Sequence, residues 1–122
     1  MKRDMDAVRQ ILLATEALGH DQQLDRLDGM DTDTFVHHVL LMQDGGLIDA
    51  RAMAGSGSMA NFAHVLRLTW AGHDFLDAAR SDTLWQKAKT EVMRPGLSFT
   101  FDLVKDWLKT EIAQGFPSLR GV

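Results

Sequence analysis

The chain has 122 residues, no cysteine and a formal net charge of -4 at pH 7. This length suits one compact domain with a core of its own, and the lack of cysteine excludes disulfides, thiolate metal sites and a cysteine nucleophile. The acidic balance disfavours a strong nonspecific grip on nucleic acid. No apolar run approaches the roughly 20 residues of a membrane span, and Asp4 and Asp6 follow the opening Met1-Lys2-Arg3 at once. We therefore expect a cytoplasmic protein with no membrane association.

Charge is unevenly spread along the chain. Residues 1–44 contain four basic and nine acidic groups, residues 45–80 contain three of each, and residues 81–122 contain six basic and five acidic groups. The negative field therefore belongs to the N-terminal part.

The first predicted helix covers about residues 4–18, because apolar side chains recur there at helical spacing. Its apolar positions are Met5, Val8, Ile11, Leu12 and Leu18, and Gly19 is the expected stop. Residues 20–31 are polar and turn-rich. They form either a loop or a loop with one short strand around residues 24–27.

The second predicted helix begins near Asp31 or Thr32, either of which can cap the unpaired backbone N–H groups. Asp33 adds favourable charge at the helix N-terminus. Its apolar stripe consists of Phe35, Val36, Val39, Leu40 and Met42. The pair Gly45-Gly46 ends the helix, with Leu47 folding back on the last turn as in a Schellman motif.

Two stretches then alternate with the period of a half-buried strand. In the first, residues 48–54, apolar and polar side chains alternate from Ile48 onwards. In the second, residues 64–69, His64, Leu66 and Leu68 share one face, which we predict to be the packed one. The glycine- and serine-rich residues 55–61 between them predict a hairpin tip.

The C-terminal part predicts further helices. Thr69 is the expected N-cap of a helix starting at Trp70, and the apolar stripe changes phase at residues 81–83, where we expect a kink or break. A last helix begins near Ser98 or Thr100. Its apolar stripe, expected to be mostly core with any surplus forming a homodimer interface, consists of Phe101, Val104, Trp107, Leu108 and Ile112.

This order of elements predicts a mainly α fold with a small β-hairpin, resembling a winged helix-turn-helix. We expect a single domain over residues 1–122, with a core over residues 1–80 and C-terminal helices over residues 81–115.

Four segments of the sequence carry a resemblance: MKRDMDAVRQILLATE, VHHVLLMQDGGLI, LTWAGHDFLDAAR and LWQKAK. The chain resembles an uncharacterised family of short bacterial and prophage proteins, classed as a domain of unknown function, from Met1 to about Trp107. The resemblance implies a phage or mobile-element context and a winged-helix-like fold, with varying wing length near residues 55–60. The family carries no assigned activity, so it supplies no functional residues.

A winged helix that reads DNA places one helix in the major groove and its wing on the backbone or minor groove. The corresponding candidate surface consists of Thr34, His37, His38, Gln43, Arg51, Ser56, Ser58 and Arg67. The second helix supplies no Arg or Lys to this surface. Phosphate pairing needs cations and guanine is read most often by Arg, so we expect weak DNA binding.

The alternative function is an acidic inhibitor or adaptor that binds a basic surface of a host protein by mimicking nucleic acid. Its candidate residues are Asp28, Asp31 and Asp33. An acidic surface that only maintains solubility is the simpler explanation of the same residues.

The remaining patterns do not predict catalysis or metal binding. His37 and His38 are adjacent on a helix and point about 100° apart, unlike an i, i+4 pair that chelates one ion. The aspartates of residues 25–33 lack the spacing of a calcium loop. The GSGS segment joins two strands and contains no Lys, unlike a phosphate loop. We expect no enzyme activity, no metal and no cofactor.

Overall fold

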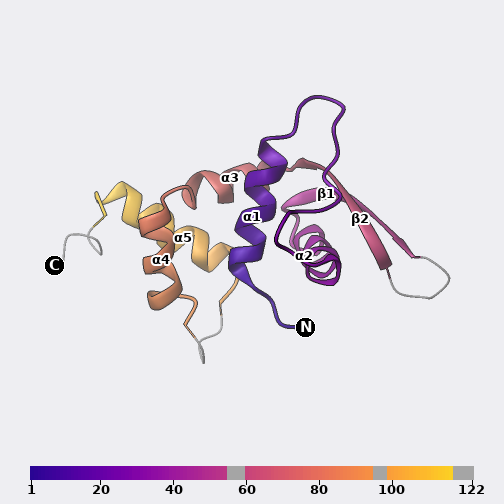
Figure 1. The fold of residues 1–122 in the computed structure, drawn as a ribbon. Helices are drawn as coiled ribbons and strands as arrows, with labels where there is room; N and C mark the ends of the chain where they lie inside the picture. Colours follow the sequence, from indigo (N-terminus) through magenta and orange to yellow (C-terminus); the bar gives the residue numbers. More distant parts are fainter. Residues whose placement is uncertain (55–59, 95–98, 117–122) are drawn as a thin grey trace. The chain divides into compact units, whose positions relative to one another are not determined.

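The computed structural model describes residues 1–54, 60–94 and 99–116 (Figure 1). The described residues form five helices and one two-stranded antiparallel sheet, so the fold is mainly helical. The chain divides into two compact units, Met1–His73 and Asp74–Val122. None of the described helices has the length and apolar character that crossing a bilayer requires. The expectation of a single domain stays a prediction.

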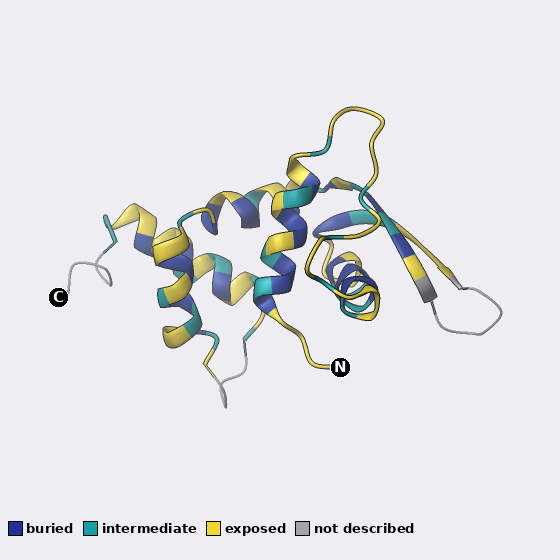
Figure 2. Ribbon diagram, viewed as in Figure 1, coloured by how far each residue is buried: buried dark blue, intermediate teal, exposed yellow. Residues whose placement is uncertain are grey.

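The first unit packs two helices against the hairpin. Its elements are α1 (Met5–Glu16), α2 (Thr32–Asp44), β1 (Ile48–Ala54), β2 (Ala60–Leu68) and the first residues of α3 (Trp70–Ala78). Helix α2 packs on both strands, and α1 packs on α2 and β2. Figure 2 colours the buried residues of these elements dark blue, and the core of the unit includes Val8, Ile11, Leu12, Phe35, Val39, Met42, Ile48, Ala63, Val65 and Leu68.

Helix α1 begins where expected and ends earlier than predicted. The Asp4 carboxylate accepts the backbone N–H of Asp6 at 2.9 Å and caps the helix. The helix ends at Glu16, with Ala17 as its C-cap. In the loop that follows, the backbone of Leu24 exchanges two hydrogen bonds with Val65, of 3.0 and 2.8 Å. The short strand considered for residues 24–27 is therefore a single bridge residue at the edge of β2.

Helix α2 has the predicted ends. Asp31 is its N-cap and accepts the backbone N–H of Thr34. At the other end Gly46 takes a φ of 76°, which L side chains rarely adopt. The Leu47 N–H bonds to the Met42 carbonyl at 2.9 Å and the Gly46 N–H bonds to the Gln43 carbonyl at 3.0 Å. This pair of bonds is a Schellman motif and turns the chain directly into β1.

The two strands form an antiparallel hairpin as predicted, but β2 begins at Ala60, so the predicted tip of residues 55–61 is too long and the predicted strand start too late. The predicted packed face of β2 is correct for Leu68 and wrong for His64 and Leu66. Asp49 pairs with Arg67 and Ala50 pairs with Val65, which leaves Leu66 as the extra residue of a β-bulge. The bulge changes the phase of the side chains, so that Val65 and Leu68 are both buried although they are three residues apart. His64 and Leu66, expected on the packed face, are only partly buried.

The start of α3 is fixed to the turn between α2 and β1. Thr69 caps α3 as predicted, because its hydroxyl accepts the Gly72 N–H at 3.0 Å. The Thr69 N–H bonds to the Leu47 carbonyl at 3.0 Å, and its hydroxyl donates to the Gly46 carbonyl. The end of β2 is thereby tied to the residues that begin β1.

The second unit contains the rest of α3 with α4 (Asp82–Glu91) and α5 (Phe101–Ala113). Ser81 caps α4 and Thr100 caps α5, which confirms the predicted break and the predicted start of the last helix. Phe75 makes edge contacts with Trp85 and Phe101 at ring distances of 6.4 and 5.6 Å.

The apolar stripe of α5 is only partly core. Val104 and Leu108 are fully buried, Phe101 and Trp107 are half-buried, and Ile112 remains 43% exposed. A homodimer through this stripe stays a prediction.

We expect Gly72→Ala to lower the free energy of unfolding by at least about 2 kcal/mol. A Cβ at this position would lie 2.0 Å from the Leu47 carbonyl oxygen, a backbone atom that is held by Thr69. The control is the exposed neighbour in the same helix, Ala71→Gly, which should cost about 1 kcal/mol through helix propensity alone. Urea denaturation followed by circular dichroism measures both. Equal losses in the two variants would contradict the close contact.

Candidate interaction surface

Helix α2 presents a polar, acidic side to solvent. Gln43, Asp33 and Asp44 are exposed, while Thr34 and His37 are partly buried. The helix contains no Lys or Arg. A phosphate backbone approaching this side would meet two carboxylates and no cation, which is repulsive.

His38 does not belong to this exposed side, which corrects its assignment to the DNA-binding surface. It is 1% exposed, and it lies on the buried stripe because it follows Phe35 by three residues and precedes Met42 by four. Its Nε2 accepts the Asp4 N–H at 2.8 Å, and its Nδ1 lies 2.7 Å from the Thr34 carbonyl, which it meets as a donor. His38 therefore joins the start of α1 to the first turns of α2.

His37, the neighbour of His38, is also partly enclosed by the protein. Its Nε2 atom is buried and has no hydrogen-bond partner among the described residues. Burial is the main cause that lowers the pKa of His37, followed by the charge of His38 and then by the amino terminus. The neutral ring is therefore the form that the folded protein favours.

The hairpin supplies a different exposed surface, on the side of the sheet away from the helices. Three cross-strand pairs form it: Asp49 with Arg67, Arg51 with His64, and Met53 with Phe62. We call these six residues the outer face. The alternate positions Ala63 and Val65 point to the opposite side and are buried, because neighbouring residues of a strand point to opposite sides.

The outer face combines charge with exposed apolar side chains. Arg67 forms an ion pair with Asp49 at 2.6 Å and donates to the Leu68 carbonyl at 3.2 Å, so much of its charge is offset. Arg51 is exposed and forms no ion pair within the described residues. Met53 and Phe62 are each 43% exposed, and the Phe62 ring meets the His64 ring edge-on at 6.2 Å.

The structure thus separates the residues proposed for DNA binding into two groups. Arg51 and Arg67 lie on the outer face, which is turned away from α2, whereas Thr34, His37 and Gln43 belong to α2. Gln43 donates to the Ala50 carbonyl at 2.9 Å and so covers part of the β1 edge. Ser56 and Ser58 lie outside the described residues.

Met53, Phe62 and His64 could not be recognised from the sequence as surface partners of Arg51. Finding them required the strand register.

The acidic residues of the alternative surface are exposed near the start of α2. Asp28 and Asp33 are exposed in the loop and in the first turn. Asp31 is also exposed, but it accepts the Thr34 hydroxyl, and this hydrogen bond is the largest cause that lowers its pKa.

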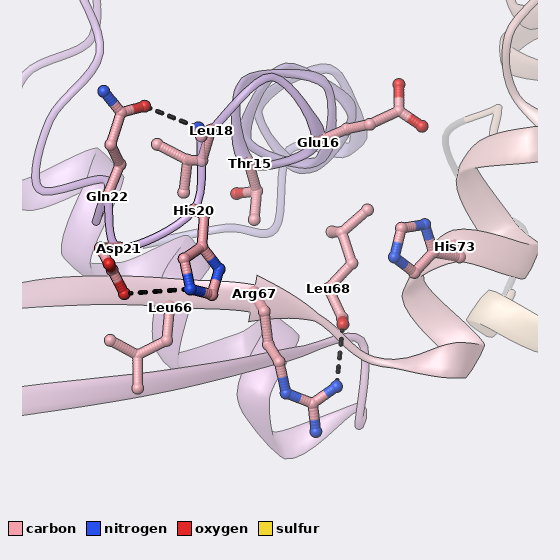
Figure 3. Close-up of a pocket in the computed structure, with 11 residues that line it drawn as sticks. Thr15, Glu16, Leu18, His20, Asp21, Gln22, Leu66, Arg67, Leu68 and His73 are labelled. Carbon is pink, nitrogen blue, oxygen red and sulfur yellow. Dashed lines mark hydrogen bonds and ion pairs between the residues drawn. The ribbon is translucent and has the colours of Figure 1, made fainter.

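A depression of about 460 Å³ lies beside the end of α1, the loop after it and the end of β2 (Figure 3). Leu18, Leu66 and Leu68 contribute apolar surface to it, and His20 and His73 contribute imidazole rings. His20 pairs with its neighbour Asp21 at 3.5 Å. No nucleophile is joined to a base there, and across the described ranges no three His, Asp or Glu side chains could hold a metal ion.

Comparison with known proteins gives two matches. Residues 2–98 match the model of a family described as "Hypothetical protein (DUF2513)". A Haemophilus influenzae protein named "Uncharacterized protein" is 35% identical over 117 residues, which cover 93% of this chain and 98% of the relative. No solved structure matches the chain. The resemblance to an uncharacterised family, classed as a domain of unknown function, is confirmed.

We expect the stability of the protein to fall as the pH drops below about 6.5, the ordinary pKa of histidine. Because the pKa of His37 is lowered in the folded protein, the unfolded chain binds a proton at this histidine more readily than the folded chain does. The stability that neutral His37 contributes is therefore present above the ordinary pKa and is lost as the pH falls through the lowered pKa. His37→Asn should reduce this loss in urea denaturation series at several pH values. His20→Asn, at a side chain 97% exposed, is the control and should leave the pH profile unchanged.

Proposed function

We propose that this chain, which belongs to the DUF2513 family of hypothetical proteins, is a non-enzymatic, winged-helix regulatory module from a phage or mobile element that binds DNA through its hairpin. The observation that carries the proposal is the outer face. It has a net positive charge in a unit that is otherwise acidic. The phage context comes from the sequence resemblance alone.

The connection of the elements supports the winged-helix assignment. Helix α2 leads through the Schellman turn directly into the hairpin, which corresponds to a wing. Leu24 adds a bridge on the edge of β2, in the place of a short third strand. A helix followed by a wing, with a helix before both, is the arrangement that winged-helix proteins use for binding nucleic acid.

Charge decides which part of the unit faces the DNA. Residues 1–47 contain four basic and nine acidic groups, whereas residues 48–68 contain Arg51, Arg67 and only Asp49 as an acid. A polyanion is therefore attracted to the hairpin and repelled by the α2 side. Because Asp49 offsets part of the Arg67 charge, the logarithm of affinity should fall with the logarithm of salt concentration with a slope between about -1 and -2.

A second candidate function, binding of a basic protein surface, is favoured by the exposed carboxylates near the start of α2. Asp28, Asp31 and Asp33 stand within six positions of one another and are all exposed. Such a group complements a lysine- or arginine-rich partner and could occupy a host protein's nucleic-acid site.

The test is fluorescence anisotropy of labelled mixed-sequence duplex DNA with the purified protein, at low and at physiological salt. Arg51→Glu should weaken binding at least tenfold, since it reverses the one outer-face charge that has no ion pair among the described residues. Asp33→Asn should strengthen binding slightly by removing repulsion. Unchanged or stronger binding by Arg51→Glu with weaker binding by Asp33→Asn, or no binding at low salt, would reject the DNA proposal and favour a basic protein partner. In that case the double variant Asp28→Lys with Asp33→Lys should fail to bind this partner.

A further inference from the structure

We infer that the outer face of the hairpin, and not helix α2, enters the major groove of duplex DNA and reads base edges there. This inference rests on the proposed function and specifies its contacts. It assigns a groove and individual base contacts to Arg51, Met53 and Phe62.

The dimensions of the hairpin suit that groove. Two paired strands lie about 4.8 Å apart, and the major groove, about 12 Å wide, admits a two-stranded ribbon whereas the minor groove is about 6 Å wide. The pairs Arg51–His64 and Met53–Phe62 are neighbours on one side of the ribbon. They are separated by about 7 Å along it, which is about two base-pair steps.

The chemistry of the outer face also matches the major groove. An arginine can donate two hydrogen bonds to O6 and N7 of guanine, and Arg51 is exposed with no ion-pair partner in the described parts of the chain. The thymine methyl group is exposed only in the major groove, where it takes apolar contacts. Met53 and Phe62 supply an exposed apolar pair next to Arg51.

Contacts within the outer face hold the side chains beside Arg51 in fixed positions. Phe62 is held edge-on by His64, and the ion pair of Arg67 with Asp49 fixes the next pair along the ribbon. The ion pair also leaves Arg51 as the stronger attractor of guanine. Helix α2, in contrast, would carry Asp33 and Asp44 into a groove lined by phosphates.

The experiment uses base analogues that alter one groove at a time. The wild-type chain first selects duplexes from a pool with a randomised centre, and one selected duplex is resynthesised in four forms: unmodified, with uracil for thymine, with 7-deazaguanine for guanine, and with inosine for guanine. The first two replacements remove a methyl group or N7 from the major groove, and inosine removes only the minor-groove amino group. Anisotropy titrations compare wild type, Phe62→Ala, Arg51→Ala and the exposed loop control Arg26→Ala.

We expect uracil to weaken wild-type binding about fourfold, as the loss of one buried methyl group would, and 7-deazaguanine to weaken it at least fivefold. Inosine should have no effect. Phe62→Ala should no longer respond to uracil, Arg51→Ala should no longer respond to 7-deazaguanine, and Arg26→Ala should respond as wild type does.

Other outcomes overturn the inference in distinguishable ways. Sensitivity to inosine alone would place the hairpin in the minor groove and leave the DNA-binding proposal intact. Major-groove sensitivity that Phe62→Ala and Arg51→Ala do not change would assign the contacts to another element. A pool that yields no enriched duplex, from a protein that still binds mixed-sequence duplex, rejects base reading by the hairpin. No binding to any duplex rejects the proposed function itself. Self-association that is lost in Phe62→Ala would show that a second copy covers the outer face.

Discussion

The first unit depends on the backbone between Gly46 and Leu47. The Leu47 N–H closes the last turn of α2, and its carbonyl accepts the N–H of Thr69 at the start of α3. Gly46 provides the positive φ for the turn and a carbonyl for the Thr69 hydroxyl. Two residues thus hold the end of one helix, the start of another and both outer ends of the hairpin. Any change there would act on all three elements together.

Because the ends of β1 and β2 are held in this way, the bulge at Leu66 changes which side chains of β2 face the core. Ile48 and Leu68 are fixed opposite each other at the open end of the hairpin, away from its tip, so the extra residue, Leu66, cannot be absorbed by sliding the strands. The phase of β2 changes instead. Leu68 points into the core, while Arg67, His64 and Phe62 all reach the outer face. The exposed surface with the net positive charge is therefore a consequence of one inserted residue and a fixed end.

The sequence could predict features that depend on neighbouring residues, but not the bulge, which depends on how the two strands pair. Caps and stops depend on a few neighbouring residues, so local pattern identified Thr69 and narrowed the other N-caps to Asp31 or Thr32, residues 81–83, and Ser98 or Thr100. The structure selects Asp31, Ser81 and Thr100 from these. The bulge depends on pairing between residues 15 or more positions apart, which alternation within one strand does not show.

The candidate site shows the same limit at two places. His38 could not be separated from the surface because its partner, the Asp4 N–H, is 34 residues away in the chain. Met53 and Phe62 are unremarkable as single residues. They become a surface only when the strands are paired.

The structure also bears on the origin of the acidity, and thereby on the choice of partner. Asp4 and Asp31 each accept backbone N–H groups at the start of a helix, and Asp6 and Asp33 stand in the first turns, where negative charge stabilises the helix dipole. These four carboxylates thus have a structural reason to be where they are. An acidic surface selected for a basic partner does not need its carboxylates to coincide with helix starts. The cation and the apolar pair of the outer face, in contrast, take no part in capping or in the core, and the proposed contact with a partner would account for both. This difference is the reason for placing function on the hairpin.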